Sequence, residues 1–220
     1  MRRAMVLVLA VLGVLAAGLP ALGAAPSPDE QAVVASGLLR RADFPPGWTA
    51  TKKGSSPNFA KLGVACRPLV TALNRRVIRE SSSGFILNNA ERASNTVVLF
   101  GAPAGAVALF AALQNPVTTA CYRRSATVSV AETAARSGVK LQVVSVAPLS
   151  VAPAGDQSLG YEAVVRASAP GQSQLIYEDA VFIRVGRAAV SFDFVNTNSS
   201  PNGAFAPQIQ AVVGRVQAAE

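Results

Sequence analysis

The chain has 220 residues, a formal charge of +8, two cysteines and no histidine. Without an imidazole, Ser-His-Asp catalysis, Cys-His catalysis and the common zinc sites are excluded. Half of the residues are hydrophobic, and a chain of this length buries enough surface to form the core of one domain.

Residues 1–24 are typical of a secretory signal peptide. A basic start is followed by an apolar run over residues 4–19 and then by small residues. We expect cleavage after Gly23 or Ala24, which leaves residues 25–220 as a secreted or cell-envelope domain. An uncleaved membrane anchor is the alternative, because the apolar run is close to the ~20 residues that a span requires.

Segments typical of helices and strands alternate in the first half of the expected mature chain. Ser27 as N-cap, followed by Pro28 and Glu30, predicts a helix that begins with a capping box. The segment D-F-P-P-G-W then forces a turn, and a short strand is expected at 48–53. We interpret Trp48 as an anchor of the core, with a platform for a ligand as the alternative.

Three further helices and two strands follow. One helix opens at Pro68, and the strands cover 84–89 and 94–100, the second ending in the buried run V-V-L-F. A helix over 103–115 has the clearest pattern, and an Asn-Pro pair stops it. Residues 122–138 favour another helix. The apolar stripes expected on the first two helices are Leu69, Val70, Leu73 and Val77, and Ala106, Leu109, Phe110 and Leu113.

Four consecutive strands are expected between Val139 and Asn196, before a last helix at 205–216. The Gly186-Arg187 pair suits a type II′ hairpin turn, because glycine tolerates a positive φ. The resulting register pairs Val185 with Ala188, Ile183 with Val190, and Val181 with Phe192. One face of this hairpin is therefore apolar, and the other carries Glu178, Arg184, Ser191 and Asp193. Such alternation indicates a half-buried antiparallel sheet.

This order of elements predicts a single α+β domain over residues 25–220. We expect an antiparallel sheet of about five to seven strands, with helices on one or both faces. The central strands should lie between Val139 and Val195, and the helices at 103–115 and 206–218 should pack their apolar stripes on the sheet.

The two cysteines, Cys66 and Cys121, are interpreted as one disulfide, because the chain is expected to be exported. Two buried free thiols are the alternative. Cys66 precedes the helix that opens at Pro68, and Cys121 follows the helix that stops at Asn115. The bridge is therefore expected to tie two helix ends across the sheet.

Two patterns suggest catalysis only weakly. Ser137 and Lys140 match the S-x-x-K motif of penicillin-interacting enzymes, but this motif needs a helix N-terminus and its usual companions S-D-N and K-T-G are absent. Glu178 and Asp193 share one face of the hairpin and are the candidate pair for glycoside hydrolysis. A solvated sheet face explains these two acids equally well. Asp179 falls on the apolar face, where a sheet edge or a cation such as Arg166 would accommodate it.

Basic residues recur as doublets along the chain. They are Arg40-Arg41, Lys52-Lys53, Arg75-Arg76 and Arg123-Arg124. Aromatic residues make up only 6% of the chain, whereas a nucleic-acid surface combines such charges with exposed aromatics. We therefore expect no nucleic-acid partner. An anionic envelope molecule is the better partner class, and scattered solvated charge is the simpler interpretation.

Several segments together resemble a known family. They are L-L-R-R-A-D-F-P-P-G-W, the two spaced cysteines, V-A-P-A-G-D-Q-S, and Y-E-D-A-V-F-I-R-V-G-R-A-A-V-S-F. This set resembles the PknH-like extracellular sensor domains of actinobacterial secreted proteins, and its layout is similar to that of Mog1/PsbP-like envelope lipoproteins. The resemblance implies an antiparallel sheet flanked by helices, with a ligand cleft. No catalytic residue carries over from it.

The leading functional hypothesis is a non-catalytic, exported ligand-binding or sensor-like domain of the cell envelope. Its ligand would be an apolar or anionic envelope molecule, and a membrane or envelope protein would be its signalling partner. We expect no cofactor and no metal. The alternatives are an envelope hydrolase that uses Glu178 and Asp193, and a scaffold for a protein partner.

Overall fold

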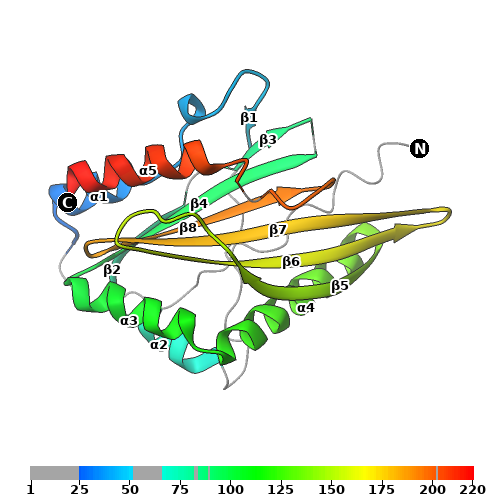
Figure 1. The fold of residues 1–220 in the computed structure, drawn as a ribbon, viewed down its shortest axis with the longest axis horizontal. Coiled ribbons are helices and arrows are strands. Elements are labelled where there is room, and N and C mark those ends of the chain that lie inside the picture. The colour runs from blue at the N-terminus through cyan, green and yellow to red at the C-terminus, as the bar shows by residue number, and fades with distance from the viewer. Residues whose placement is uncertain (1–24, 52–65, 82–83, 89, 202) are drawn as a thin grey trace.

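The computed structural model describes residues 25–51, 66–81, 84–88, 90–201 and 203–220; the expected signal peptide at residues 1–24 lies outside this part. Its strands form one antiparallel sheet in the order β1-β3-β4-β8-β7-β6-β5, and β2 also pairs with β4 (Figure 1). The strands are β1 (Thr49–Ala50), β2 (Arg76–Ser81), β3 (Phe85–Leu87), β4 (Glu91–Phe100), β5 (Lys140–Leu149), β6 (Gln157–Ala169), β7 (Gln172–Val185) and β8 (Ala188–Asn196). The predicted α+β class is confirmed.

The described α-helices cover both faces of this sheet. They are α1 (Pro28–Ser36), α2 (Arg67–Leu73), α3 (Pro103–Gln114), α4 (Val117–Ser137) and α5 (Ala206–Ala219), and a short 3-10 helix, η2 (Arg41–Asp43), follows α1. In Figure 1, α1 and α5 lie on one face, whereas α2, α3 and α4 lie on the other. Each pair of layers encloses its own buried apolar cluster. The molecule is therefore a three-layer sandwich around a central sheet.

The central hairpin has the predicted register. Val185 pairs with Ala188 and Val181 pairs with Phe192. Gly186 has a φ of +52°, whereas Arg187 is not among the residues with positive φ. This agrees with the predicted type II′ turn, in which only the first central residue has a positive φ.

The more polar face of the hairpin is not solvated, contrary to the prediction of a half-buried sheet. Phe182 and Ser191 lie on this face, and both are buried. Phe182 belongs to the apolar cluster that α2, α3 and α4 close over the sheet. The alternation in the sequence reflects two buried faces of different polarity rather than one buried and one exposed face.

Most predicted helices are confirmed, with their caps. Ser27 and Glu30 form the reciprocal capping box, in which each side chain accepts a backbone N–H of the other residue. In α3, the predicted stripe of Ala106, Leu109, Phe110 and Leu113 is buried, as are the four residues of V-V-L-F in β4. The last helix, α5, packs against the sheet through Val212 and Val216.

Two boundaries differ from the prediction. Val77 was expected on the helix that opens at Pro68, but α2 ends at Leu73 and Val77 lies exposed in β2. This strand brings the sheet to eight described strands, one more than the predicted maximum. Cys121 follows α3, as expected, but it lies inside α4, which begins at Val117 and extends to Ser137. Both cysteines belong to the apolar cluster on the face that α2, α3 and α4 cover, so the predicted tie across the sheet is wrong. Gly138 stops α4 with a φ of +68°.

Candidate functional site

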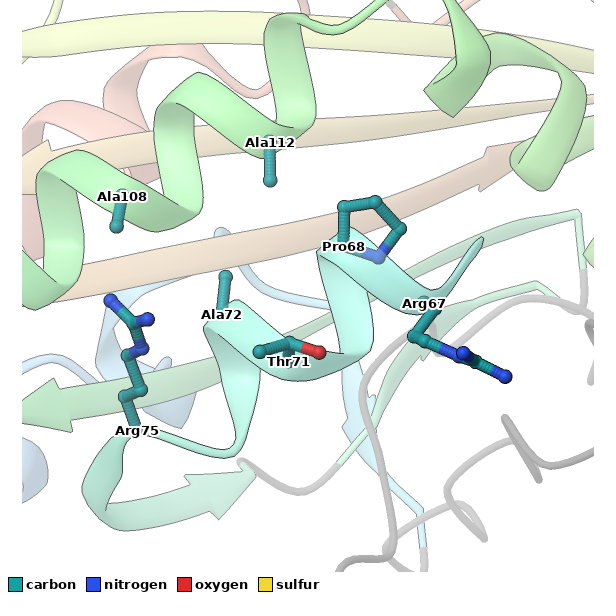
Figure 2. Close-up of a pocket in the computed structure, with 7 residues that line it drawn as sticks. All are labelled: Arg67, Pro68, Thr71, Ala72, Arg75, Ala108 and Ala112. Atoms are coloured by element: carbon teal, nitrogen blue, oxygen red, sulfur yellow. The ribbon is translucent and has the colours of Figure 1, made fainter. Parts of the chain in front are cut away.

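The main candidate site is a groove between α2 and α3 (Figure 2). It has a volume of about 550 Å³ and is open to solvent. Pockets of ~300–1,000 Å³ are the usual size for small-molecule sites, so the groove is large enough for a small organic ligand. Its lining residues are Arg67, Pro68, Thr71, Ala72, Arg75, Ala108 and Ala112, and we refer to them as the α2–α3 groove.

Small side chains create the groove. Leu109, Phe110 and Leu113 point from α3 into the core, so the opposite side of this helix presents alanines. Ala108 and Ala112 face Ala72 of α2, as Figure 2 shows. Methyl groups at these positions keep the two helices apart without filling the space between them. The floor of the groove is therefore apolar and carries one hydroxyl, that of Thr71.

Two arginines flank this apolar floor. Arg67 begins α2, and Arg75 follows its last turn, so the two lie at opposite ends of the helix. Both are exposed, and neither guanidinium has a hydrogen bond or ion pair with another described residue. Neither α2 nor α3 contains an acidic residue. An apolar floor with cations at both ends that have no partner among the described residues is chemically suited to an amphiphile that carries an anionic group.

The disulfide fixes the position of α2. Cys66 directly precedes Arg67, and its Cα atom lies 5.5 Å from that of Cys121 in α4. The two cysteines are at bonding distance, as the disulfide prediction requires. An isolated helix of seven residues is unstable in water. The bridge therefore ties the start of α2 to α4, and the packing of Leu69 and Leu73 on the core holds the rest of the helix in place.

The candidate catalytic pair lies elsewhere, on the sheet face that α2, α3 and α4 cover. Asp193 is opposite Ala180, and Glu178 is opposite Val195, so both acids occupy this face as the sequence predicted. Neither acid lines the α2–α3 groove. Glu178 exposes only 4% of its surface. A sugar would have to reach a carboxyl group that is almost completely buried, so this arrangement gives the hydrolase hypothesis little support.

The environment of Glu178 strongly favours its neutral form. Burial raises the pKa of its carboxyl group well above the usual value, and the negative charge of Asp193 raises it further. Arg92 opposes this shift, whereas Asp179 adds to it. The Oε1 atom of Glu178 is buried and has no hydrogen-bond partner among the described residues. These conditions disfavour the ionised form of this buried carboxyl group.

Tyr122 of α4 covers the same region of the sheet. Its ring stacks on Tyr161 with the ring centroids 4.6 Å apart, and it meets Phe182 edge-on. Burial raises the pKa of the Tyr122 hydroxyl, and Asp193 and Glu178 contribute to the shift. The hydroxyl of Tyr161 donates a hydrogen bond to the carbonyl of Leu113. These contacts show that the aromatic residues of α4 and β6 form part of the core.

Asp179 lies under a second, much smaller cavity on the opposite face of the sheet. It is opposite Phe194, as predicted, and β7 is a central strand rather than a sheet edge. Its Oδ2 atom accepts a hydrogen bond from the Ser200 hydroxyl at 3.1 Å. About 40 Å³ of the cavity is open to the centres of water molecules. This space holds a few waters at most, so we do not interpret it as a ligand site.

A third cavity, of about 440 Å³, lies where the junction of α3 and α4 meets β5 and β6. Its lining includes the polar side chains of Gln114, Asn115, Thr119 and Tyr161 and contains no charged residue. Compared with the α2–α3 groove, it lacks a group that would select a ligand by charge. The α2–α3 groove is therefore the better candidate.

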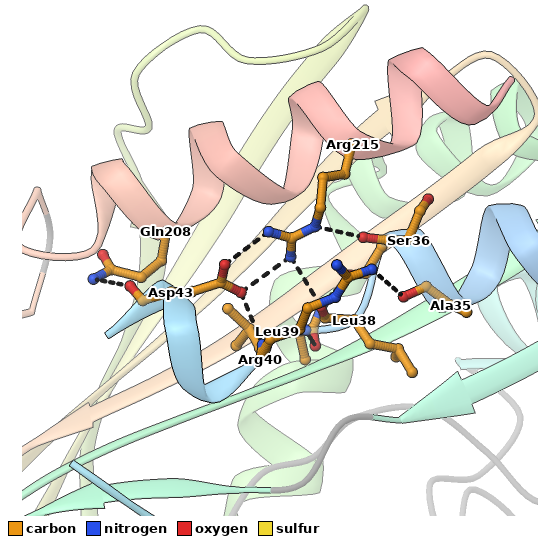
Figure 3. A network of polar contacts seen from close by, with 10 residues as sticks. Ala35, Ser36, Leu38, Leu39, Arg40, Asp43, Gln208 and Arg215 are labelled. Carbon is orange, nitrogen blue, oxygen red and sulfur yellow. Dashed lines mark hydrogen bonds and ion pairs between the residues drawn. The ribbon is translucent and has the colours of Figure 1, made fainter. Parts of the chain in front are cut away.

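A dense polar network on the α1–α5 face has a structural role (Figure 3). Arg215 of α5 binds both carboxylate oxygens of Asp43 and donates hydrogen bonds to the carbonyls of Ser36 and Leu38. Gln208 donates to the Asp43 carbonyl. The Arg215 guanidinium and the Asp43 carboxylate are satisfied by these contacts, whereas the buried Oε1 atom of Gln208 has no hydrogen-bond partner among the described residues. The network joins α5 to the segment after α1 and leaves no group directed at a ligand.

Trp48, Ser137 and the basic doublets are the other residues that the sequence singled out. Trp48 is buried and stacks on Phe44, so it is a core anchor. Ser137 is the last residue of α4, which is the wrong end of a helix for the S-x-x-K motif. Of the basic doublets, only Arg75-Arg76 contributes to the α2–α3 groove, and Lys52-Lys53 lies outside the described residues.

The described residues form neither a metal-binding cluster nor a single membrane-spanning helix. In it, no group of three or more acidic or cysteine residues is arranged to hold a metal ion. No single described helix is both long and apolar enough to cross a membrane; α3 and α4 pass that test only jointly, as a pair bent by 80°.

Comparison with known proteins gives a weak structural match. No protein-family model matches the chain, and no curated protein matches it significantly. Among solved structures, the chain is similar to the extracellular domain of PknH from Mycobacterium tuberculosis. The match covers 89% of this chain and the whole of that domain, with 11% sequence identity and a TM-score of 0.42. The resemblance noted in the sequence therefore extends to weak structural similarity and does not establish a family.

Proposed function

We propose that this protein is a non-catalytic, exported binding domain of the cell envelope, and that its α2–α3 groove holds an amphiphile with an anionic group. One observation supports this proposal above the others. Arg67 and Arg75 flank an apolar groove of about 550 Å³, and their guanidinium groups have no partner among the described residues. Unpaired arginines beside an apolar surface favour a ligand that has both an acyl or aryl part and a negative charge.

An extracytoplasmic location fits the chemistry of the two cysteines. Disulfides form and persist mainly outside the cytosol, and Cys66 and Cys121 lie with their Cα atoms 5.5 Å apart. The expected signal peptide at residues 1–24 points to the same compartment. Because the bridge holds the helix that carries Arg67, the oxidised protein is the form expected to bind.

The groove contains no residue that suits catalysis. Thr71 is its only hydroxyl-bearing residue, and no histidine occurs in the chain to act as a base for it. Without a nucleophile–base pair, the groove can hold and release a ligand but has no evident means of transforming it. The proposed role of the groove is therefore ligand binding. A sensing role would require an envelope protein that responds to the bound state.

A pair of fluorescent probes tests this proposal. 8-Anilinonaphthalene-1-sulfonate carries a sulfonate, and N-phenyl-1-naphthylamine is a neutral analogue of similar shape. We expect both probes to bind the groove, the anionic one more tightly. The double variant R67Q/R75Q should weaken binding of the sulfonate about tenfold or more, because each lost charge-assisted contact is worth ~1.5–3 kcal/mol at most, and should leave the neutral probe almost unchanged.

A matched pair of leucine substitutions locates the site. Ala108 lines the groove, whereas Ala111, one turn further along the same exposed side of α3, does not. A108L should displace both probes, and A111L should displace neither, although both substitutions preserve a good helix-forming residue. Equal binding by these two variants would show that the probes bind somewhere else and would refute the proposed site.

A further inference from the structure

The outer surface around the α2–α3 groove combines exposed apolar and cationic groups. Val107 lies on the solvent side of α3 and exposes 49% of its surface, the largest exposed fraction among the large hydrophobic residues described. Ala104 and Ala111 are also exposed and lie about one turn away on either side of it. These three residues are spaced at i, i+3 and i+7, so they form one solvent-facing side of the helix, next to the groove residue Ala108.

The described helices α2 and α3 contribute no negative charge to this surface. Arg67 and Arg75 border it, and neither α2 nor α3 has an acidic side chain that would neutralise them. The α3 helix carries no charge along its whole length. A surface of this kind, with an apolar centre and a cationic border, is complementary to the interface of a membrane that contains anionic lipids.

We infer that this surface docks on an anionic lipid bilayer, with Val107 entering the interfacial region and Arg67 and Arg75 contacting lipid phosphates. The inference builds on the proposed function, since it places the mouth of the α2–α3 groove at the membrane, where anionic amphiphiles reside. A single amphiphile then moves between bilayer and groove without crossing water.

The expected interaction is weak and depends on charge. One basic residue near an anionic membrane surface contributes about a fivefold change in partitioning, so R67Q/R75Q should reduce binding to anionic vesicles by roughly 20-fold. V107S should reduce it roughly fivefold, because a half-exposed valine loses much of its transfer free energy. Rising salt concentration should weaken the binding of the unmodified protein.

Vesicle sedimentation provides the test. The protein used is residues 25–220, which contain every described helix and strand and exclude the apolar segment that would itself bind lipid. Vesicles of phosphatidylcholine are compared with vesicles that also contain phosphatidylglycerol. Two controls make the same kinds of substitution on strands instead of helices: V144S in β5, where Val144 exposes 42% of its surface, and R166Q in β6, where Arg166 is exposed.

The inference predicts binding to the anionic vesicles that is reduced in R67Q/R75Q and V107S and is unchanged in R166Q and V144S. Equal binding by V107S and V144S, or no preference for phosphatidylglycerol, would overturn it. Titration with 8-anilinonaphthalene-1-sulfonate separates the two proposals, since Val107 does not line the groove. If the unmodified protein binds the probe but not the anionic vesicles, only the docking surface is refuted. If it binds the vesicles but not the probe, only the groove is refuted.

Discussion

Arg215 and Asp43 are 172 residues apart in the sequence, yet the guanidinium group of one holds both carboxylate oxygens of the other, at 2.7 and 3.0 Å. Asp43 exposes 6% of its side chain and Arg215 exposes 24%. Such a bidentate pair has the fixed geometry that arginine provides and lysine does not. The pair attaches α5 to the turn after α1 and thus closes the layer opposite the proposed binding surface.

Substitutions in this pair should destabilise the fold without affecting the groove. R215K should be nearly as destabilising as R215M, because a lysine cannot hold both carboxylate oxygens and the carbonyls of Ser36 and Leu38 at the same time. We expect a loss of about 2–4 kcal/mol in the free energy of unfolding, since Asp43 would remain buried without its partner. Urea denaturation measures this loss. Full stability in R215K would contradict the role of the bidentate geometry.

Asn95 of β4 is a buried residue whose role the sequence does not reveal. It exposes 1% of its surface; its amide group donates to the carbonyl of Gly37 at 2.7 Å, and its Oδ1 atom accepts the N–H of Leu39 at 2.9 Å. N95A should cost about 2–5 kcal/mol, because two buried backbone groups lose their partners. N198A, in an exposed loop, is the control. Comparable unfolding midpoints for the two variants would refute this assignment.

The sequence predicts those parts of the fold that depend on local signals. The capping box at Ser27 and the turn at Gly186 are encoded by adjacent residues, and their positions in the structure agree with the prediction. The apolar stripe of α3 needs only a helical period. By contrast, β2 carries no clear alternation, and Val77 continues the helical pattern of the preceding residues. Pairing with β4, a contact distant in sequence, decides its conformation.

The candidate site is less predictable than the fold. The α2–α3 groove exists because Ala72, Ala108 and Ala112 lie opposite one another on two helices. The residue pattern of neither helix predicts that the two helices lie side by side. The doublet Arg75-Arg76 is visible in the sequence, but only the structure distinguishes its members. Arg76 donates to the carbonyl of Leu73, whereas Arg75 lines the groove. A polar residue such as Glu178 predicts that its sheet face is solvated. The sequence does not show that helices cover this face.

Removing the disulfide should weaken both stability and binding. Cys66 and Cys121 are 55 positions apart, and on the chain-entropy model a bridge of this span contributes ~4 kcal/mol. We expect C66A/C121A to unfold at markedly lower urea concentration and to bind 8-anilinonaphthalene-1-sulfonate less tightly, since Arg67 is next to the bridge. Thiol titration of the unfolded, oxidised protein provides an independent check. Two free thiols per chain would show that the bridge does not form.

The buried carboxyl group of Glu178 should make stability depend on pH. Its pKa is raised in the folded protein by burial and by Asp193, so the folded state binds a proton more tightly than the unfolded state does. The stabilisation from this proton is complete below the unfolded pKa of ~4.3. It is lost as the pH rises through the folded pKa, by up to ~1.4 kcal/mol per pH unit.

The substitution E178Q, which keeps the shape of the neutral acid, should therefore raise stability relative to the unmodified protein as the pH increases from about 4.3. The charged or titratable groups around this position, Arg92, Asp179, Asp193 and Tyr122, remain in the variant. Unfolding measured at acidic, neutral and alkaline pH gives the difference directly. A stability difference that stays constant with pH would mean that Glu178 is ionised in the folded protein.

The central claim is that a ligand with apolar and anionic parts binds between α2 and α3, and amide chemical-shift mapping by NMR tests it most directly. Decyl phosphate, kept below its micellar concentration, is titrated into the isotopically labelled, oxidised protein. We predict saturable shifts concentrated at Thr71, Ala72, Ala108 and Ala112, which are absent in A108L and retained in A111L. Shifts concentrated instead around Glu178, or no saturable shifts at all, would contradict the claim.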